Sequence, residues 1–128
     1  MLSNHHAIAT LPAADLDRAR RFYEGTLGFR PRTADSAGTI YETADGKGFM
    51  VFPSTGRPSG NHTQITFEVD DVEREVRDLK ESGVRFEAVE MDGYDPETTI
   101  VTTDSFRGAW FRDPEGNLLA LTEWTNGA

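Results

Sequence analysis

The chain of 128 residues contains no cysteine. A protein without cysteine has no disulfide framework, no thiolate nucleophile and no cysteine-ligated zinc or iron–sulfur site. A metal would have to be bound by histidine, aspartate or glutamate, and only three histidines are present.

Long apolar runs are absent as well. No stretch reaches the roughly 18 apolar residues that a membrane span requires. Residues 1–6 lack the positive charge and the apolar segment that begin a secretory signal. We therefore expect a cytoplasmic protein with no membrane partner.

Positive charge is scarce and scattered. The 13 lysines and arginines face 22 aspartates and glutamates, for a formal net charge of −9, and a chain without a basic patch is not expected to bind nucleic acid. The excess of negative charge is most simply a solubility charge, but it also favours a neutral or cationic small molecule over an anionic one. The hydrophobic content of 37% is enough for the core of one domain, or of two small halves that share it.

Two segments show the apolar spacing of helices. The first begins after Asp15 and ends at Gly28, and the second begins after Asp70 or Asp71 and ends at Gly83. Glu73 lies three positions after Asp70, which is the spacing of a capping box.

Alternating segments typical of strands precede and follow each helix. "HAIATLPAAD" and "QITFEVDD" precede the helices, while "TIYETADGKGFMVFPS" and "AWFRDPEGNLLALTEW" follow them, each with an internal turn. Asp113, Glu115 and Asn117 lie in the turn of the last segment, where Asp, Gly and Asn serve backbone geometry, so we expect turn formation and not catalysis.

This order, a strand, a helix and a strand meander, occurs twice. Asp71 follows Asp15 by 56 positions, and at the same offset Leu16 matches Val72, so the chain is predicted to be an internal duplication within a single domain, with modules at residues 1–56 and 57–128. "PSTGRPSGNH" is the expected linker. The second half carries a longer insertion, "EMDGYDPETTIVTTDSFRG", expected to be a loop at a binding site.

Four segments, "ADLDRARRFYEGTLGF", "TFEVDDV", "GVRF" and "WFRDPEGNLLAL", resemble the vicinal oxygen chelate superfamily. This superfamily contains glyoxalase I, extradiol dioxygenases, fosfomycin-modifying enzymes and bleomycin-binding resistance proteins. The resemblance covers nearly the whole chain. It implies an α+β fold of two βαβββ modules whose mixed sheets form a cup, commonly completed by a homodimer.

The resemblance also implies where a metal would be held. In metal-using members a histidine or glutamine and a glutamate from each module enter the cup. Counting from the helix starts and the turns assigns these positions to Ile8, Gln64, Ala120 and either Met50 or Val51. Only Gln64 carries a donor atom, so a divalent cation would lose hydration without replacement ligands. We therefore expect no metal and no other cofactor.

Two histidines lie at equivalent places in the two halves. His6 and His62 are 56 positions apart, and each precedes an implied ligand position by two residues, which on a strand means the same face. Two such imidazoles would bind a relocated metal or transfer protons. The alternative is that both, like His5, lie in solvent where a strand begins.

Polar residues in one strand register and aromatic residues on the last strands suggest a ligand site instead. Gln64, Thr66 and Glu68 alternate with apolar neighbours and share one face. Apolar and aromatic walls with a few polar groups suit a flat aromatic ligand. The predicted ligand-binding residues are Gln64, Thr66, Glu68, Met50, Phe52, Tyr94, Trp110, Thr122, Trp124, His6 and His62.

The leading hypothesis is a metal-free protein that binds a small aromatic molecule, neutral or cationic, resembling the resistance proteins that sequester an antibiotic. The first alternative is a lyase or isomerase that uses His6, His62 or Glu68 for acid–base chemistry, or a metal enzyme with relocated ligands. The second is an accessory or regulatory domain. No catalytic residue is assigned, because no Ser-His-Asp spacing, phosphate-binding glycine loop or dinucleotide fingerprint is present.

Overall fold

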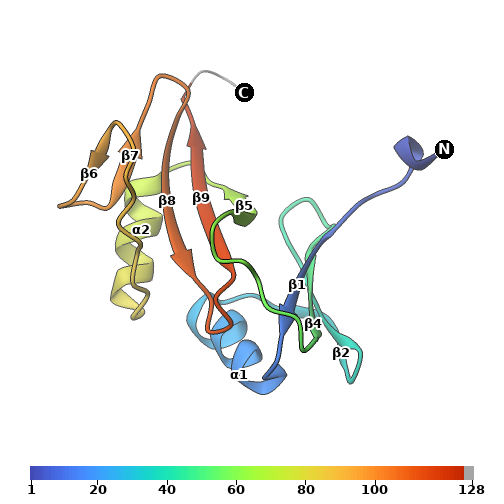
Figure 1. Ribbon diagram of the computed structural model, residues 1–128. Coiled ribbons are helices and arrows are strands. Elements are labelled where there is room, and N and C mark those ends of the chain that lie inside the picture. Colours follow the sequence, from blue (N-terminus) through green and yellow to red (C-terminus); the bar gives the residue numbers. More distant parts are fainter. Residues whose placement is uncertain (126–128) are drawn as a thin grey trace. The chain divides into compact units, whose positions relative to one another are not determined.

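A computed structural model describes residues 1–125. The chain forms two compact units (Figure 1). Unit 1 contains Met1–Ser59 and Pro114–Asn117, and unit 2 contains Gly60–Asp113 and the chain from Leu118 onward. Each unit has one mixed sheet and one main helical segment, which confirms the α+β class and the duplicated βαβββ order. No helix among residues 1–125 is long and apolar enough to cross a membrane.

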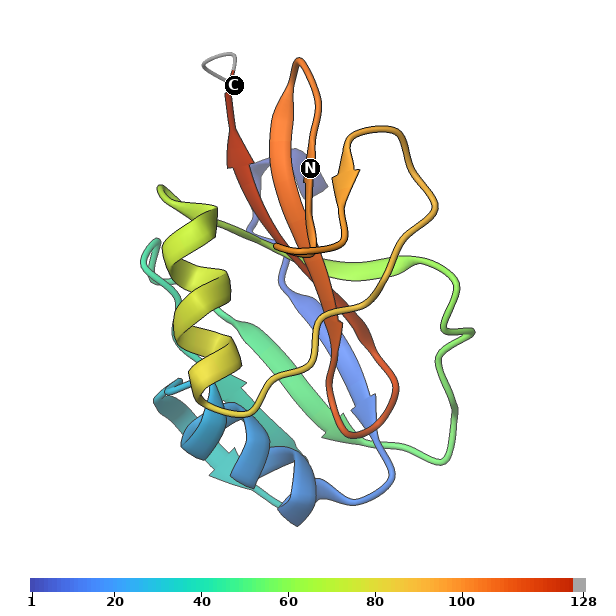
Figure 2. The same ribbon diagram turned by 90° about the vertical axis from the view of Figure 1, so that its left-hand side faces the viewer.

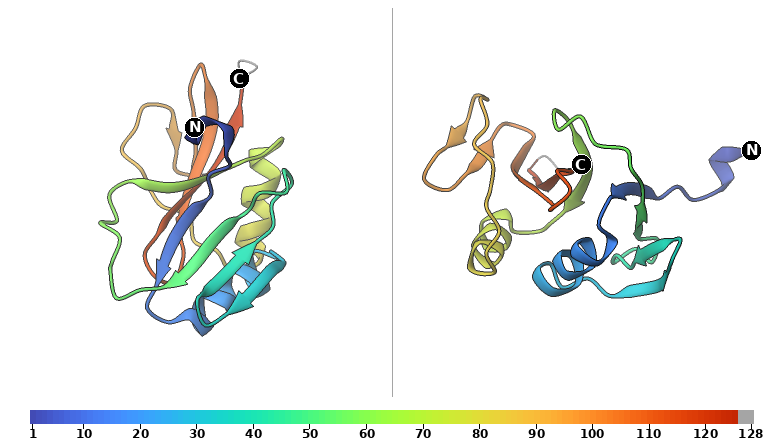
Figure 3. Two further views of the ribbon diagram at one scale, coloured as in Figure 1. Left: turned by 90° about the vertical axis from the view of Figure 1, so that its right-hand side faces the viewer. Right: turned by 60° about the horizontal axis from the view of Figure 1, so that its bottom comes forward.

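Unit 1 has a four-stranded sheet in the order β1-β4-β3-β2, in which β1 runs parallel to β4 and the other pairs are antiparallel (Figure 3). A short π-helical segment, η2, continues the first helix directly. The elements are η1 (Leu2–Asn4), β1 (Ala9–Ala13), α1 (Leu16–Arg20), η2 (Arg21–Thr26), β2 (Pro31–Asp35), β3 (Gly38–Tyr41) and β4 (Phe49–Pro53).

Unit 2 has a five-stranded sheet in the order β5-β9-β8-β7-β6, with β5 parallel to β9 and the other pairs antiparallel. Helix α2 lies along one face of this sheet (Figure 2). The elements are β5 (Thr63–Glu68), α2 (Val72–Glu81), β6 (Tyr94–Asp95), β7 (Ile100–Thr102), β8 (Phe106–Arg112) and β9 (Leu118–Trp124).

Both main helices begin in the same way. The side chain of Asp15 accepts a hydrogen bond from the Arg18 amide (3.0 Å), and that of Asp71 accepts one from the Arg74 amide (3.1 Å), so each aspartate satisfies an amide that has no partner within the helix. The capping box suggested by Glu73 is wrong, because the cap is Asp71 and the third residue after it is an arginine.

In each unit the helical segment packs against one face of the sheet, and the side chains between the two form the buried core. In unit 1 the rings of Tyr23 and Tyr41 stack at 5.6 Å and Phe49 lies 5.5 Å from both. In unit 2 the residues Phe111 and Leu119 are at most 1% exposed. The side chains of the alternate strand positions point to the opposite face of each sheet, away from the helix.

The insertion of unit 2 is only partly a loop. We expected the insertion at residues 90–108 to be a loop, but within it Ile100–Thr102 pairs with β8 and Tyr94–Asp95 pairs with β7, adding two strands to the sheet. A run such as Ile100–Val101 is too short to predict a strand by itself, and it becomes one because β8 offers an unpaired edge.

Candidate functional site

The face of the unit 2 sheet opposite α2 is the candidate site. Cross-strand register aligns Thr66, Ala120 and Trp110 in one row, and Glu68, Thr122 and Gly108 in the next. Residues paired across a sheet point to the same side, and the neighbouring positions point toward α2. We call this the aromatic face, and it comprises Thr63, Thr66, Glu68, Phe106, Gly108, Trp110, Arg112, Leu118, Ala120, Thr122 and Trp124.

Three rings form a cluster on the aromatic face. The ring of Phe106 lies 6.5 Å from that of Trp110, with an interplanar angle of 82°, and 6.3 Å from that of Trp124, with an angle of 72°. Both pairs have the edge-to-face geometry that the ring quadrupoles favour. The cluster is therefore a preformed aromatic surface.

Hydrogen bonds orient both indoles. Trp124 donates its Nε1–H to a Glu68 carboxylate oxygen at 2.5 Å, and Trp110 donates to the Thr63 hydroxyl at 3.0 Å. Glu68 is exposed and Trp124 keeps 41% of its surface in solvent. Since a carboxylate has two acceptor oxygens, Glu68 can hold the indole and still receive a donor from a ligand. The site thus combines exposed aromatic surface with a negative charge.

Gln64 occupies an irregular point of β5. The pairing with β9 shifts between Thr63 and Ile65, so Gln64 is the extra residue of a bulge. Its Oε1 atom is buried and has no hydrogen-bond partner among residues 1–125. Buried polar atoms are usually satisfied, so this unpaired oxygen is an exception within the unit 2 sheet. Strand alternation holds from Ile65 onward, and the bulge interrupts it at Gln64.

Other predicted ligand residues are not gathered around the rings. Met50 and Phe52 belong to β4 of unit 1, where they are half-buried and lie on the face opposite α1. Tyr94 lies on the outermost strand of the unit 2 sheet, in the register of Val101 and Gly108 but separated from β8 by β7. Trp110, Thr122 and Trp124 are the predicted residues of β8 and β9 that share the aromatic face.

Both histidines of interest are exposed. His6 precedes β1 and lines a shallow pocket of about 290 Å³ in unit 1, together with Ile8, Arg32 and the Asp45–Lys47 turn. His62 immediately precedes β5 in unit 2. Their role as a pair stays a prediction.

The residues at the positions where the superfamily holds a metal do not fit a divalent cation. Met50 pairs with Thr10, as Ala120 pairs with Thr66, whereas Val51 is 1% exposed in the core. Met50 is therefore the equivalent of Ala120. Gln64 provides one neutral oxygen, and a divalent cation requires several oxygen or nitrogen donors. Within residues 1–125 no three histidine, aspartate or glutamate side chains form a group that could hold an ion.

Phe106 and Thr63 are among the members of the aromatic face that were missed from the sequence. Phe106 lies four residues before Trp110, so strand alternation could have placed it on the same face. Thr63 gave no signal, because its position depends on the bulge at Gln64.

The turn between β8 and β9 has a larger role than chain reversal. The carboxylate of Glu115 accepts hydrogen bonds from the amides of Ala14 (2.6 Å) and Asp15 (3.1 Å) and from the guanidinium of Arg18 (2.8 Å). Burial raises the pKa of Glu115, but these hydrogen bonds outweigh it and hold the pKa below its usual value. Asn117 is fully buried and donates to the carbonyl of Pro12 at 3.1 Å. These side chains complete the start of α1.

Comparison with known proteins agrees with this architecture. The family model described as the Glyoxalase/Bleomycin resistance protein/Dioxygenase superfamily matches residues 4–121. No curated protein matches the sequence.

Solved structures share the fold at low sequence identity. A glyoxalase/bleomycin resistance protein/dioxygenase from Alicyclobacillus acidocaldarius is 18% identical, with a TM-score of 0.72 over 96% of this chain and 93% of that one. A glyoxalase family protein from Enterococcus faecalis is 20% identical, with a TM-score of 0.70 over 96% of this chain and 100% of that one. A protein from Nocardioides is 17% identical, with a TM-score of 0.68 over 97% and 87%. Such identities establish the fold alone.

Proposed function

Because the chain belongs to the Glyoxalase/Bleomycin resistance protein/Dioxygenase superfamily, we propose that it binds a small, flat aromatic molecule without a metal. The observation that carries the proposal is the edge-to-face cluster of Phe106, Trp110 and Trp124, with the Glu68 carboxylate hydrogen-bonded to the exposed indole. A planar ligand gains by stacking on such rings. The carboxylate then selects between ligands of different charge.

The proposed ligand is neutral or cationic. Glu68 gives a local negative charge, and the net charge of −9 acts in the same direction. The polar groups of Thr66, Thr122 and Gln64 supply hydrogen bonds that fix ligand orientation. Sequestration of an antibiotic or metabolite of this chemistry is the function that we favour.

Tryptophan fluorescence tests the proposal directly. We expect proflavine, a planar cation, and phenazine, which is uncharged, to quench emission saturably, and naphthalenesulfonate to bind more weakly. Trp124→Ala should weaken proflavine binding about tenfold, since stacking contributes roughly 0.5–1.5 kcal/mol beyond buried area. Glu68→Gln removes the charge but keeps the size of the side chain, and it should reduce the preference for proflavine over phenazine. Absence of quenching by all three probes would refute an aromatic ligand.

The same experiment separates binding from catalysis. In the alternative function, a lyase or isomerase, Glu68 or one of the histidines His6 and His62 transfers a proton. A bound compound that is recovered with an altered mass or isomeric form would support the enzyme, and one recovered unchanged would support sequestration.

We also propose a homodimer. Each sheet ends in two edge strands, β1 and β2 in unit 1, and β5 and β6 in unit 2. Edge strands expose unpaired backbone groups, which association between identical chains satisfies. Light scattering at micromolar concentration should give twice the mass of one chain, and a single-chain mass would contradict the proposal.

A further inference from the structure

A second concave site lies on the other side of the unit 2 sheet. It is an open groove of about 540 Å³ between α2 and the chain that leads into β7. This volume lies within the range of small-molecule sites. The groove, here called the α2 groove, is lined by Glu73, Val76, Arg77, Lys80, Glu81, Thr98 and Ile100.

The floor of the α2 groove is apolar. Val76 and Ile100 are 3% and 2% exposed and belong to the core beneath it. The aliphatic stems of Arg77 and Lys80 form part of its walls. A hydrocarbon chain would therefore contact mainly these stems, above the buried Val76 and Ile100.

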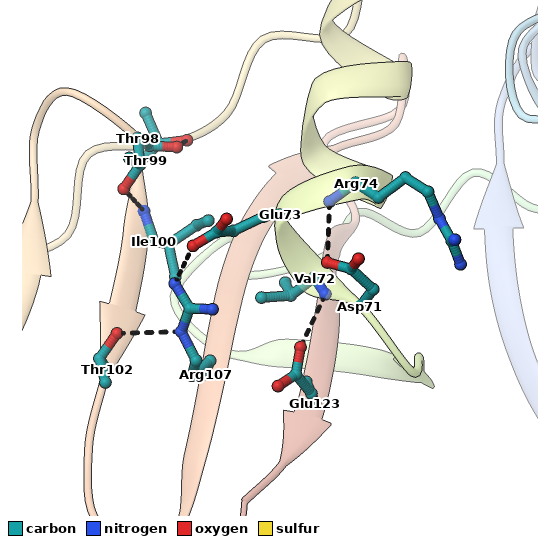
Figure 4. Close-up of polar contacts among 10 residues, drawn as sticks. All are labelled: Asp71, Val72, Glu73, Arg74, Thr98, Thr99, Ile100, Thr102, Arg107 and Glu123. Carbon is teal, nitrogen blue, oxygen red and sulfur yellow. Dashed lines mark hydrogen bonds and ion pairs between the residues drawn. The ribbon is translucent and has the colours of Figure 1, made fainter.

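Contacts within the protein engage two of the acceptor groups of the groove, the Glu73 carboxylate and the Thr98 carbonyl. Glu73 forms an ion pair with Arg107 at 2.7 Å, and the two side chains point toward each other (Figure 4). Arg107 is also held by the Thr102 hydroxyl. The carbonyl of Thr98 accepts from Lys80 at 3.1 Å and from the hydroxyl of Thr99. The charge of Glu73 is therefore balanced by Arg107, and the Thr98 carbonyl is already engaged.

Donors remain in excess. Lys80 has three N–H donors and uses one for the Thr98 carbonyl. The guanidinium of Arg77 forms no ion pair or hydrogen bond with any of the described residues 1–125. Glu81 is the one groove carboxylate without an ion pair in that range, so two cationic side chains face one uncommitted anionic side chain. This balance favours an anionic group on the ligand.

Backbone strain beside the groove is an independent sign of a ligand site. Thr99 has φ of 65°, a left-handed conformation that a β-branched residue rarely adopts. The turn is held in place because the Thr99 amide donates to the Asp95 carbonyl at 2.7 Å and the Ile100 amide donates to the Thr98 hydroxyl at 3.2 Å. Strained residues fixed by their surroundings cluster at ligand sites.

We propose that the α2 groove binds a short aliphatic carboxylate, with the carboxylate between Arg77 and Lys80 and the hydrocarbon chain over Val76 and Ile100. This site is separate from the aromatic face, because α2 lies on the opposite side of the sheet. It does not depend on the function proposed above.

The test is a titration of the full chain with sodium hexanoate, followed by amide chemical shifts. We expect saturable shifts confined to residues 73–81 and 98–100. Hexanamide has a chain of the same length but no charge, and it should bind at least about tenfold more weakly. No shift at tens of millimolar hexanoate, equal binding of hexanamide, or shifts confined to the aromatic face would each overturn the proposal.

Variants on α2 sharpen the test. Arg77→Gln should weaken hexanoate binding about tenfold, and Glu81→Gln should strengthen it severalfold by removing a repulsive charge. Arg74→Gln is the matched control, because Arg74 lies on the same helix but does not line the groove, and it should leave binding unchanged. Equal loss in the Arg74 and Arg77 variants would show attraction by overall charge and would overturn the site.

Discussion

The two units share their buried positions and differ on the opposite sheet face. Cross-strand register pairs Ile40 with Met50 in unit 1 and Trp110 with Ala120 in unit 2. Each unit 2 residue follows its unit 1 equivalent by 70 positions, since 110 minus 40 and 120 minus 50 are both 70. The core of each unit is apolar, but the opposite face carries Ile40, Met50 and the single ring of Phe52 in unit 1 and a cluster of three rings in unit 2.

The polar positions diverge in the same way. Pro12 pairs with Phe52 in unit 1, where Glu68 pairs with Thr122 in unit 2. Unit 2 thus carries a carboxylate and a hydroxyl at the positions where unit 1 carries a proline and a phenylalanine. The comparison shows that the two units keep apolar residues on the side of the sheet that faces the helix, and that they differ in the residues of the opposite face.

Truncation of equivalent core residues should have the largest effect. Phe49 and Leu119, 70 positions apart, are both fully buried. We expect Phe49→Ala to cost about 3–5 kcal/mol and Leu119→Ala about 2–5 kcal/mol of unfolding free energy, measured by urea denaturation. A cost below 1 kcal/mol at either site would break the equivalence of the two cores.

The two units also differ in how strongly a carboxylate distant in sequence holds the start of the helix. Glu115 receives three donors at the start of α1, while Glu123 receives the Val72 amide of α2 at 2.9 Å. Glu115→Gln should therefore cost about 1–3 kcal/mol and Glu123→Gln about 0.5–1 kcal/mol. Urea denaturation at pH 7 measures both.

The Glu115 contribution should depend on pH. Its pKa is lower in the folded chain than in the unfolded chain, so the stabilisation is complete above the unfolded pKa of about 4.3 and is lost as the pH falls. The gap between the wild type and Glu115→Gln should shrink below about pH 4. A gap that widens in acid would contradict the assigned contacts.

Exchanging equivalent residues between the two units tests whether the aromatic face is the ligand site. Trp110→Ile gives unit 2 the residue of unit 1, and proflavine binding should weaken about tenfold through loss of stacking. Ile40→Trp, the reverse exchange, should give no second site, because Pro12 stands where unit 2 has Glu68. Isothermal titration supplies the affinity and the number of sites; two sites in Ile40→Trp would show that the carboxylate is dispensable.

A single hydroxyl distinguishes the cores. Tyr41 donates to Glu24 at 2.9 Å, while its equivalent in unit 2 is Phe111. Tyr41→Phe should cost about 1 kcal/mol. Burial, and then the hydrogen bond to Glu24, raise the pKa of Tyr41, so its stabilisation is complete below about pH 10 and is lost as the pH rises. Denaturant midpoints from pH 7 to 11 should converge for the two proteins.

Much of this architecture was predictable from local patterns. Strand alternation correctly grouped Thr66 with Glu68, and the aspartates ahead of each apolar run predicted both helix starts. The bond between Glu68 and Trp124 was not predictable, because it depends on the tertiary register of β5 against β9. The role of Glu115 was hidden for a similar reason: its partners lie about 100 residues earlier in the chain.

That long separation has a consequence for synthesis. Residues 1–59 leave the ribosome first, but the residues that complete the start of α1 belong to Pro114–Asn117. Until residues 114–117 have been synthesised, the amides of Ala14 and Asp15 lack their hydrogen bonds to the Glu115 carboxylate. The carbonyl of Pro12 likewise lacks its hydrogen bond from Asn117. Contacts of such length close late and slow folding. A nascent chain released before residue 115 should therefore be trimmed readily by proteases near residue 14, and a fragment cut at residue 59 should regain protection when a peptide spanning residues 107–124 is added.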